Sequence, residues 1–588
     1  MRIKNIDVLK AFAIIAVVLY HAGIMVYGYL GVDLFLVISG YLTTKSLYKF
    51  LIVKRPAGGG YFSFEISRVI RFLPPLLVAG ICCMLLGYFV MLPDDYENLS
   101  QSVIATIFFG NNILSAITVK DYWNIANEYK PLMHTWYVGI VMQFYIVYPI
   151  LFYLAKFDKK NTKRTLLLVI GFFAIASLLI YFFTTNAASR FYYLPSRFFE
   201  FAVGGVVALT YNSNDKRSFK KEYAYVCYAV LLSLLVINVE VLSSSLRLVA
   251  VVALSSLLLC SQEVLENRVT GNALLAKIGA ASYSIFIWHQ ILLAFYRYTI
   301  TNKFTIGSYV ILLVLTVVLS WLSYQFVEQK IPEVLKTKKG KQCVYLLTIV
   351  AFALLTIYSG YIYIKAGVVR DIPELGISKT DVHRGMHAEY CDRGYLYDRP
   401  FETDKPHWLI VGNSYGRDIV NIIEESDFAD KVEVSYITVD EIGSSDNRFK
   451  DADFVIFSVL GLTDKLITEV EDKCTSNGLD THNLLIIGER NFGESNGQVY
   501  IKRHCEDYFE QYVKVEDYER YIVRNREFAG KYGERYVDMM DMVVDDENKV
   551  RVFTPDHHYI SADCYHLTKS GAKYYAQLIN LEKYVKLD

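Results

Sequence analysis

The fold of this chain is decided by residues 6–42, which read IDVLKAFAIIAVVLYHAGIMVYGYLGVDLFLVISGYL. Two apolar runs begin in this stretch, at residues 8–27 and 30–48, and each has the roughly 20 residues that a helix needs to cross a bilayer. The first run lacks a small-residue cleavage site and leads directly into the second. We therefore expect a retained first span and not a cleaved signal peptide.

Further apolar runs of similar length follow along the chain. Together they predict about eleven spans, made up of ten helices of a membrane domain and one linking span. The predicted spans are residues 8–27, 30–48, 72–92, 135–155, 166–184, 197–212, 223–240, 246–262, 278–297, 306–327 and 343–365. Another run, at residues 103–119, contains Asn111 and Asn112, and we expect a surface or re-entrant segment there.

Basic residues gather in alternate loops of this predicted topology. With the amino terminus inside, the inner loops hold clusters of Lys and Arg, for example at residues 156–164 and 330–341. The long outer loop at residues 93–133 has only Lys120 and Lys130. This positive-inside pattern predicts a multi-pass protein of the plasma or inner membrane. It places the amino terminus in the cytoplasm and the carboxy-terminal domain on the outer face.

The composition agrees with a membrane domain followed by a soluble one. The 588 residues are 53% hydrophobic, which is too apolar for one soluble domain, and the chain is too long for one core. The formal net charge of +0 gives no sign of nucleic-acid binding. We expect a membrane domain at residues 1–335, a linking helix and linker at 336–402, and an α/β domain at 403–588.

The last part of the chain alternates strand-like and helix-like segments. Apolar runs at residues 408–411, 453–459 and 484–487 predict buried strands, and residues 570–581 predict a helix. This alternation favours an α/β layered domain. Four cysteines of this part could pair outside the cytoplasm, namely Cys391, Cys474, Cys505 and Cys564. No CxxC spacing occurs, and we expect no metal site.

Histidines and charged residues occur where a membrane makes them costly. His21, His134 and His289 each lie in or at the edge of an apolar run. Each either forms an interhelical hydrogen bond or shuttles a proton, and His21 is the strongest candidate for the second role. Further charges at similar places are Asp33, Arg197 and Glu200. Arg68 and Arg71 either set the topology or clamp a phosphate-bearing donor that enters from the cytoplasm.

Two motifs of the carboxy-terminal domain predict nucleophilic catalysis. Ser414 follows a predicted strand directly, at a turn into a helix, where its hydroxyl is exposed. Asp563 stands three residues before His566, so the acid can orient the imidazole that deprotonates the serine. The alternative for Ser414 is a helix cap. Asn491 is the best candidate for an oxyanion donor, and Gly461 is the alternative.

In these motifs the chain resembles the membrane-bound acyltransferase-3 family, in the subgroup with a fused SGNH-hydrolase-like domain. The membrane motifs are residues 6–11 with His21, residues 31–42, Arg68 and Arg71 before Pro74 and Pro75, residues 132–136 with 143–145, residues 196–200 with Gly204 and Gly205, residues 282–284 with 288–289, and Ser323 and Tyr324 with Glu328. Ser414, Asp563 and His566 resemble the first and last blocks of SGNH esterases.

The resemblance implies an O-acyltransferase, most simply an O-acetyltransferase. It implies cytoplasmic acyl-CoA as donor substrate, no bound cofactor, and an envelope or surface glycan as acceptor. The family's catalytic first-span histidine maps onto His21, and its arginines map onto Arg68 and Arg71. We expect the membrane site to include Asp33, His134, Arg197, Glu200 and His289 as well.

The chain departs from the family pattern at two places. Val141 and Met142 occupy positions where the family usually has a glutamate or two, which affects how protons are handled. Asn413 replaces the usual aspartate before Ser414. Two other functions stay open: a glycan ester hydrolase that the membrane part only anchors, and an exporter without catalysis.

Overall fold

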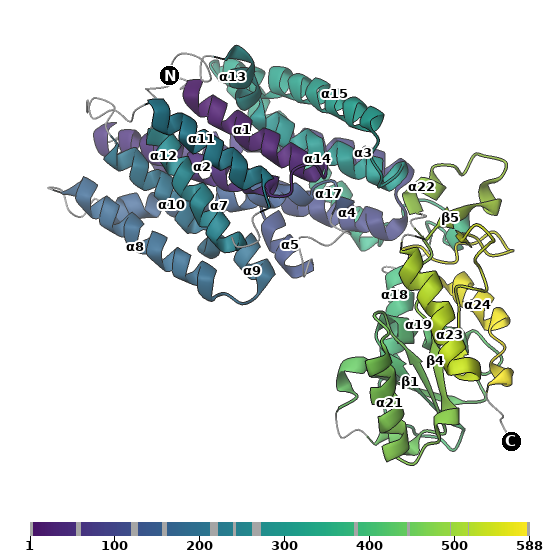
Figure 1. The fold of residues 1–588 in the computed structure, drawn as a ribbon. Coiled ribbons are helices and arrows are strands. Elements are labelled where there is room, and N and C mark those ends of the chain that lie inside the picture. Colours follow the sequence, from purple (N-terminus) through teal and green to yellow (C-terminus); the bar gives the residue numbers. More distant parts are fainter. Residues whose placement is uncertain are drawn as a thin grey trace. The chain divides into compact units, whose positions relative to one another are not determined.

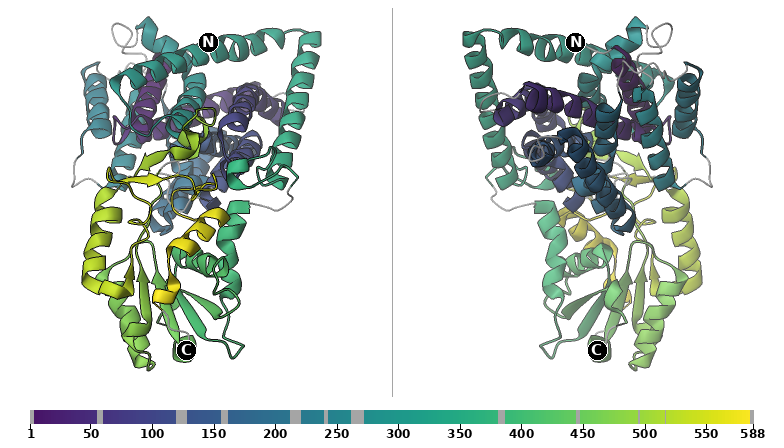
Figure 2. Two further views of the ribbon diagram at one scale, coloured as in Figure 1. Left: turned by 90° about the vertical axis from the view of Figure 1, so that its right-hand side faces the viewer. Right: turned by 90° about the vertical axis from the view of Figure 1, so that its left-hand side faces the viewer.

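The computed structural model describes residues 4–54, 60–118, 128–155, 161–211, 221–238, 243–260, 272–380, 386–443, 447–493, 496–515 and 517–584. The chain divides into two compact units (Figures 1 and 2). The amino-terminal unit comprises Met1–Leu86 and Leu99–Gly360. The carboxy-terminal unit comprises Gly87–Asn98 and Tyr361–Asp588. We describe each unit by itself.

The described residues of the amino-terminal part fold mainly into helices, as Figure 1 shows. Its helices are α1 (Lys4–His21), α2 (Gly31–Leu47), α3 (Gly60–Val90), α4 (Pro93–Ile107), α5 (Asn111–Thr118), α7 (Trp136–Ala155), α8 (Thr162–Phe183), α9 (Ala187–Tyr192), α10 (Leu194–Thr210), α11 (Lys221–Val236), α12 (Ser244–Cys260), α13 (Ala273–Ala280), α14 (Ser282–Thr299), α15 (Ile306–Ser323), α16 (Lys330–Val334) and α17 (Lys338–Ile364). Every predicted span falls largely on one of them.

Several of these helices are long and apolar enough to cross a membrane. Within the described residues there are six: Gly28–Ile52, Phe64–Val90, Met133–Ala155, Thr162–Phe183, Ile306–Val334 and Lys338–Ile364. The pair α13 and α14, bent by 69°, makes a seventh if it is one span. The chain is thus a multi-pass membrane protein, and the full number of spans and their orientation stay predictions. The run at residues 103–119 forms parts of two helices, α4 and α5.

Glycines allow two pairs of helices to approach each other closely, α2 with α10 and α13 with α1. A Cβ atom at Gly40 of α2 would lie 2.0 Å from the carbonyl oxygen of Phe201 in α10, and one at Gly204 would lie 2.0 Å from that of Val37. Small residues at helix crossings are a common device of membrane proteins. The contact fixes the start of α2 beside the start of α10. At Gly279 of α13, a Cβ would collide with the backbone of Asp7 in α1.

The carboxy-terminal unit is the expected α/β domain. Its main sheet is parallel with the order β2-β1-β3-β4-β6, where β1 is His407–Gly412, β2 is Glu433–Thr438, β3 is Phe454–Ser458, β4 is Leu484–Ile487 and β6 is Tyr536–Val537. Alternate residues of β1 face opposite sides. Trp408 and Ile410 pack with α19 (Ser414–Glu424) and α24 (Lys569–Leu578). Leu409 and Val411 pack with α21 (Asp464–Ser476) and α23 (Arg524–Tyr532).

Part of the segment expected to be a linker, residues 386–397, is helical. They form α18 (Met386–Asp392) and a 3-10 helix (Arg393–Tyr397). The buried amide of Asn421 in α19 donates to the carbonyl of Tyr390 (3.0 Å) and accepts from Arg393 Nε (2.6 Å). These bonds hold both short helices on α19. Cys391, Cys474, Cys505 and Cys564 are free thiols, so none of them forms a disulfide.

Candidate functional site

Three histidines from distant parts of the sequence meet in the amino-terminal unit. His21 is the last residue of α1, His134 lies in the 3-10 turn Met133–Thr135 that leads into α7, and His289 lies within α14. The ring of His289 lies 5.1 Å from that of His21 and 5.4 Å from that of His134, centroid to centroid. All three side chains are buried. A cluster of this kind suits proton transfer in a site from which water is excluded.

The orientation of His21 is set by a glutamine that sequence reasoning missed. Gln290 Oε1 lies 2.9 Å from His21 Nδ1. Because an amide oxygen only accepts, Nδ1 carries the proton in this arrangement and Nε2 is the basic nitrogen. Arg297, seven residues further along α14, donates from Nη2 to the carbonyl oxygen of His21 (2.5 Å). The sequence could have indicated this arrangement, because Gln290 and Arg297 are seven residues apart in one helix and therefore lie on the same face.

A buried ion cluster lies near the start of α2 and α10. Arg197 Nη1 lies 2.7 Å from Asp33 Oδ1 and 2.8 Å from Glu200 Oε1. Two carboxylates thus share one guanidinium away from water, and the cluster is neutral only if one carboxyl group holds a proton. Arg197 also lines a cavity of about 580 Å³ together with Tyr20, the neighbour of His21. The structure therefore brings this cluster to the same end of α1 as His21.

A larger cavity, of about 910 Å³, lies at the opposite end of α1. Its lining includes Asp7 and Lys10 of α1 and Arg71 of α3. Lys10 and His21 lie on one helix, so roughly 16 Å separates them along its axis. Arg68, one turn before Arg71, packs over the rings of Phe64 (4.7 Å) and Tyr145 (5.1 Å). The residues expected to form one donor site are thus divided between two ends of the helix bundle.

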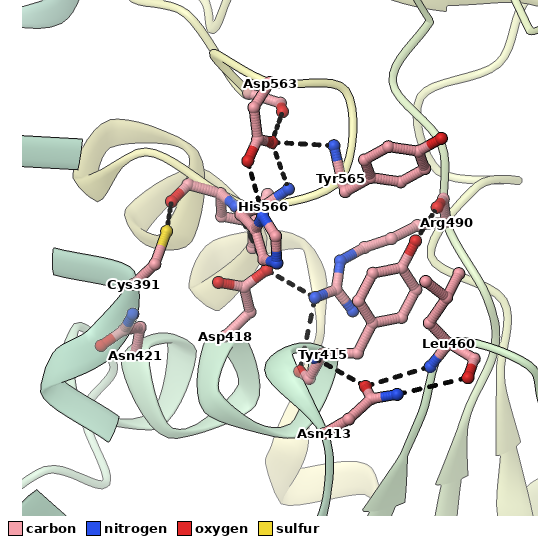
Figure 3. Close-up of polar contacts among 12 residues, drawn as sticks. Cys391, Asn413, Tyr415, Asp418, Asn421, Leu460, Arg490, Asp563, Tyr565 and His566 are labelled. Carbon is pink, nitrogen blue, oxygen red and sulfur yellow. Dashed lines mark hydrogen bonds and ion pairs between the residues drawn. The ribbon is translucent and has the colours of Figure 1, made fainter. Parts of the chain in front are cut away.

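The acid–base pair of the carboxy-terminal unit is assembled (Figure 3). His566 Nδ1 lies 2.6 Å from Asp563 Oδ2, and Asp563 Oδ1 accepts the backbone N–H of His566 (2.8 Å). Burial opposes the charged imidazolium, but the hydrogen bond and the charge of Asp563, with a contribution from Asp418, raise the pKa of His566. The pair therefore has the geometry in which a carboxylate orients a general base.

Ser414 begins α19 directly after β1, as the sequence predicted. The neighbouring Tyr415 lies with its ring 6.4 Å from the imidazole of His566, so the two loops meet. Among the described residues, Ser414 makes no hydrogen bond to His566. Catalytic hydrogen bonds often form fully only when substrate binds. The structure thus brings Asp563 and His566 together, and the role of Ser414 stays a prediction.

Asn413, where the family pattern has aspartate, is used as an amide. Its Oδ1 accepts the N–H groups of Tyr415 and Leu460, each at 3.1 Å, and its Nδ2 donates to the carbonyl of Leu460 (3.2 Å). A carboxylate can accept both of these N–H groups but cannot donate. The amide therefore ties the turn that carries Ser414 to the loop after β3.

We expect Asn413→Asp to destabilise the carboxy-terminal unit by about 1–2 kcal/mol. A carboxylate oxygen would then face the carbonyl oxygen of Leu460, to which the amide Nδ2 now donates. Thermal unfolding of the purified full chain would measure this. The matched control is Asn580→Asp, at an exposed helix start whose side chain makes no cap. Equal midpoints for the two variants would contradict this reading of Asn413.

The two oxyanion candidates differ in their hydrogen bonds. Asn491 is buried after β4, and its Oδ1 accepts the N–H of Gly493 (2.8 Å). The N–H of Gly461 donates to Glu489, as does that of Leu462 (2.6 Å), and Arg520 Nε holds the same carboxylate at 2.6 Å. The N–H of Gly461 is therefore already engaged. Asn491 stays the predicted donor.

A buried ion pair behind His566 escaped sequence reasoning. Arg490 Nη2 lies 2.5 Å from Asp418 Oδ2, and both side chains are fully buried. The same carboxylate oxygen accepts the N–H of Leu567 (3.2 Å), and the guanidinium stacks on Tyr415 at 4.0 Å (Figure 3). The pair thus braces the loops that carry Ser414, Asn491 and His566. Its residues come from segments 72 positions apart, so no local motif marks them.

The comparison with protein families identifies the helical unit. Residues 3–325 match the model of the acyltransferase-3 family, described as an acyltransferase domain. The chain is 27% identical over 354 residues to the O-acetyltransferase OatA of Staphylococcus aureus, in strains NCTC 8325 / PS 47 and COL, which is 56% of this chain and 57% of theirs. The chain thus spans about half the length of the curated relatives it matches. No solved structure matches it.

Proposed function

The chain belongs to the acyltransferase-3 family, whose domain model matches residues 3–325, and on this premise we propose that it is a membrane O-acetyltransferase acting on an envelope glycan. The observation that carries the proposal is the meeting of His21, His134 and His289 inside the helical unit. A domain that only anchored a hydrolase would need neither a buried histidine cluster nor several spans. The relatives' name supports acetyl as the group that is moved.

The donor in this proposal is cytoplasmic acyl-CoA, and the cavity of about 910 Å³ is where it binds. The nucleotide of CoA carries several phosphate charges, which cationic side chains bind well. Arg71 and Lys10 line this cavity. With the amino terminus inside, as the loop charges predict, the start of α1 and this cavity face the cytoplasm. His21 then lies toward the outer side.

The chemistry proposed for His21 uses its Nε2 nitrogen. The thioester C–S bond breaks and the acyl carbon bonds to an acceptor oxygen, while the hydroxyl proton replaces the acyl group on the thiol sulfur. Nε2 either removes this proton or carries the acyl group in between. The Asp33–Arg197–Glu200 cluster, at the same end of α1, offers a carboxyl group that can hold a proton.

The carboxy-terminal unit completes the proposal. Ser414 would carry the acyl group as an ester, His566 would take its proton, and Asp563 would hold the imidazole in place. The final acceptor is a sugar hydroxyl of a surface or envelope glycan. The short distance between His566 and Asp563 supports this second step.

The O-acyl content of the host's surface polysaccharide, measured by proton NMR, tests the proposal. We expect the ester signal to be lost in the deletion strain and in strains with His21→Ala or Ser414→Ala. The exposed residues His482 and Ser476 give matched controls, and their alanine variants should keep the signal. An excess of ester in the deletion would show a deacylase instead. An unchanged signal in all strains would leave export as the better reading.

A further inference from the structure

The cavity that we assign to the donor is lined only in part by residues that the family model matches. The family model ends at residue 325, but eight of the 19 residues that line the cavity come after it. They include Glu328, Leu335, and Lys341 and Tyr345 of α17. The rest of α17 packs on the same unit, since Phe352 lies with its ring 4.9 Å from that of Phe108. The helix that leads to the carboxy-terminal unit is therefore also a wall of this cavity.

The charged side chains that line the cavity favour an anionic ligand. The cavity is lined by Lys10, Arg71 and Lys341 and by two carboxylates, Asp7 and Glu328. Lys10 is paired with Asp7 at 3.5 Å, and Glu328 accepts a hydrogen bond from Ser284. Across the described part of the chain, no carboxylate lies within ion-pair distance of Arg71 or Lys341. Arg71 lies near enough to Glu328 for their charges to interact, and both cations are exposed. One cation from the family domain and one from α17 can therefore contact a ligand in the cavity.

The position of Lys341 in its helix adds to this preference. It lies in the first turn of α17, a helix of 27 residues, where the backbone dipole also favours an anion. Thr337 Oγ1 accepts the N–H of Gly340 (3.0 Å), which fixes the start of the helix. A Cβ at Gly340 would lie 2.0 Å from the carbonyl oxygen of Val334, so the turn that presents Lys341 is closely packed.

We propose that Lys341 of α17 binds a phosphate group of the acyl-CoA donor, together with Arg71. The proposal rests on the proposed function, and it makes the linking helix part of the donor site. A membrane domain cut off where the family model ends would therefore lack a phosphate ligand. The alternative role for the positive charge of Lys341 is to set the orientation of the chain in the membrane.

Equilibrium binding of acetyl-CoA to the purified full chain tests the proposal without knowledge of the acceptor. We expect Lys341→Ala to raise the Kd about tenfold, since loss of one charge-assisted contact of about 1.4 kcal/mol has that effect. Lys341→Arg should stay within about threefold of the wild type, because the charge is kept. Lys339→Ala is the matched control, since this neighbour has the same charge but does not line the cavity.

Acetyl-dephospho-CoA, which lacks the 3′-phosphate, separates the two possible contacts. If the penalty of Lys341→Ala vanishes with this probe, Lys341 binds the 3′-phosphate, and if it persists, Lys341 binds the diphosphate. An equal Kd for Lys341→Ala and the wild type would overturn the proposal, and so would equal losses in Lys341→Ala and Lys339→Ala. A wild-type chain that binds no acetyl-CoA would refute the proposed donor, which is a different failure.

Discussion

Arg490→Met is expected to lower the free energy of unfolding of the carboxy-terminal unit by about 3–5 kcal/mol, the usual cost of leaving one member of a buried ion pair alone. Asp418 would keep its carboxylate in a fully buried place, with only the N–H of Leu567 at 3.2 Å as a partner among the contacts described above. Pulse proteolysis of the purified full chain in a urea series would measure the change.

The double variant Asp418→Asn with Arg490→Met is the control for this prediction. It removes both charges and keeps an oxygen that can accept the N–H of Leu567. Because the cost comes from the unpaired charge, we expect the double variant to recover most of the lost stability. A double variant as unstable as Arg490→Met would show that packing of the guanidinium on Tyr415 matters more than its charge.

The effect of Arg490→Met should depend on pH in a defined direction. Burial raises the pKa of Asp418, and the charges of Arg490 and His566 oppose this rise. Without Arg490 the pKa rises further, so the folded unit binds a proton more tightly than the unfolded chain does. Stability then falls as the pH increases through this range. We expect a large deficit near neutral pH and a smaller one in mild acid, where Asp418 is protonated.

Asp563→Asn is expected to reduce ester turnover by the carboxy-terminal unit by a factor on the order of 10²–10⁴, because an amide no longer holds His566 in the tautomer that accepts a proton. The measurement is hydrolysis of 4-nitrophenyl acetate by the purified full chain. Ser414→Ala defines the background rate of the assay. The exposed Asp546 gives the matched control, and Asp546→Asn should keep the full rate.

The pH profile adds a second test of the same pair. The Asp563 carboxylate raises the pKa of His566, and the general base must be neutral. Loss of that charge lowers the pKa, so the remaining activity of Asp563→Asn should persist to lower pH than that of the wild type. A slower variant with an unshifted acid limb would mean that Asp563 supports the fold of its loop and does not tune His566.

The sequence determined the local structure of this protein well. The apolar runs predicted where the membrane helices lie, because a stretch of roughly 20 apolar residues has one low-energy form in a bilayer. The alternation of strand-like and helix-like segments predicted the α/β layered domain. The pairing of Asp563 with His566 followed from a spacing of three residues, which keeps both side chains within one turn.

Only the tertiary structure decided which distant groups meet. His21, His134 and His289 lie on three separate helical segments, and the Gly40 and Gly204 crossing brings Asp33 to Arg197. The partners Asp418 and Arg490 belong to different strand–helix units. Folding of residues 386–397 onto Asn421 was equally hidden. Sequence patterns report the period and polarity of each segment, whereas such contacts depend on how whole segments pack against one another.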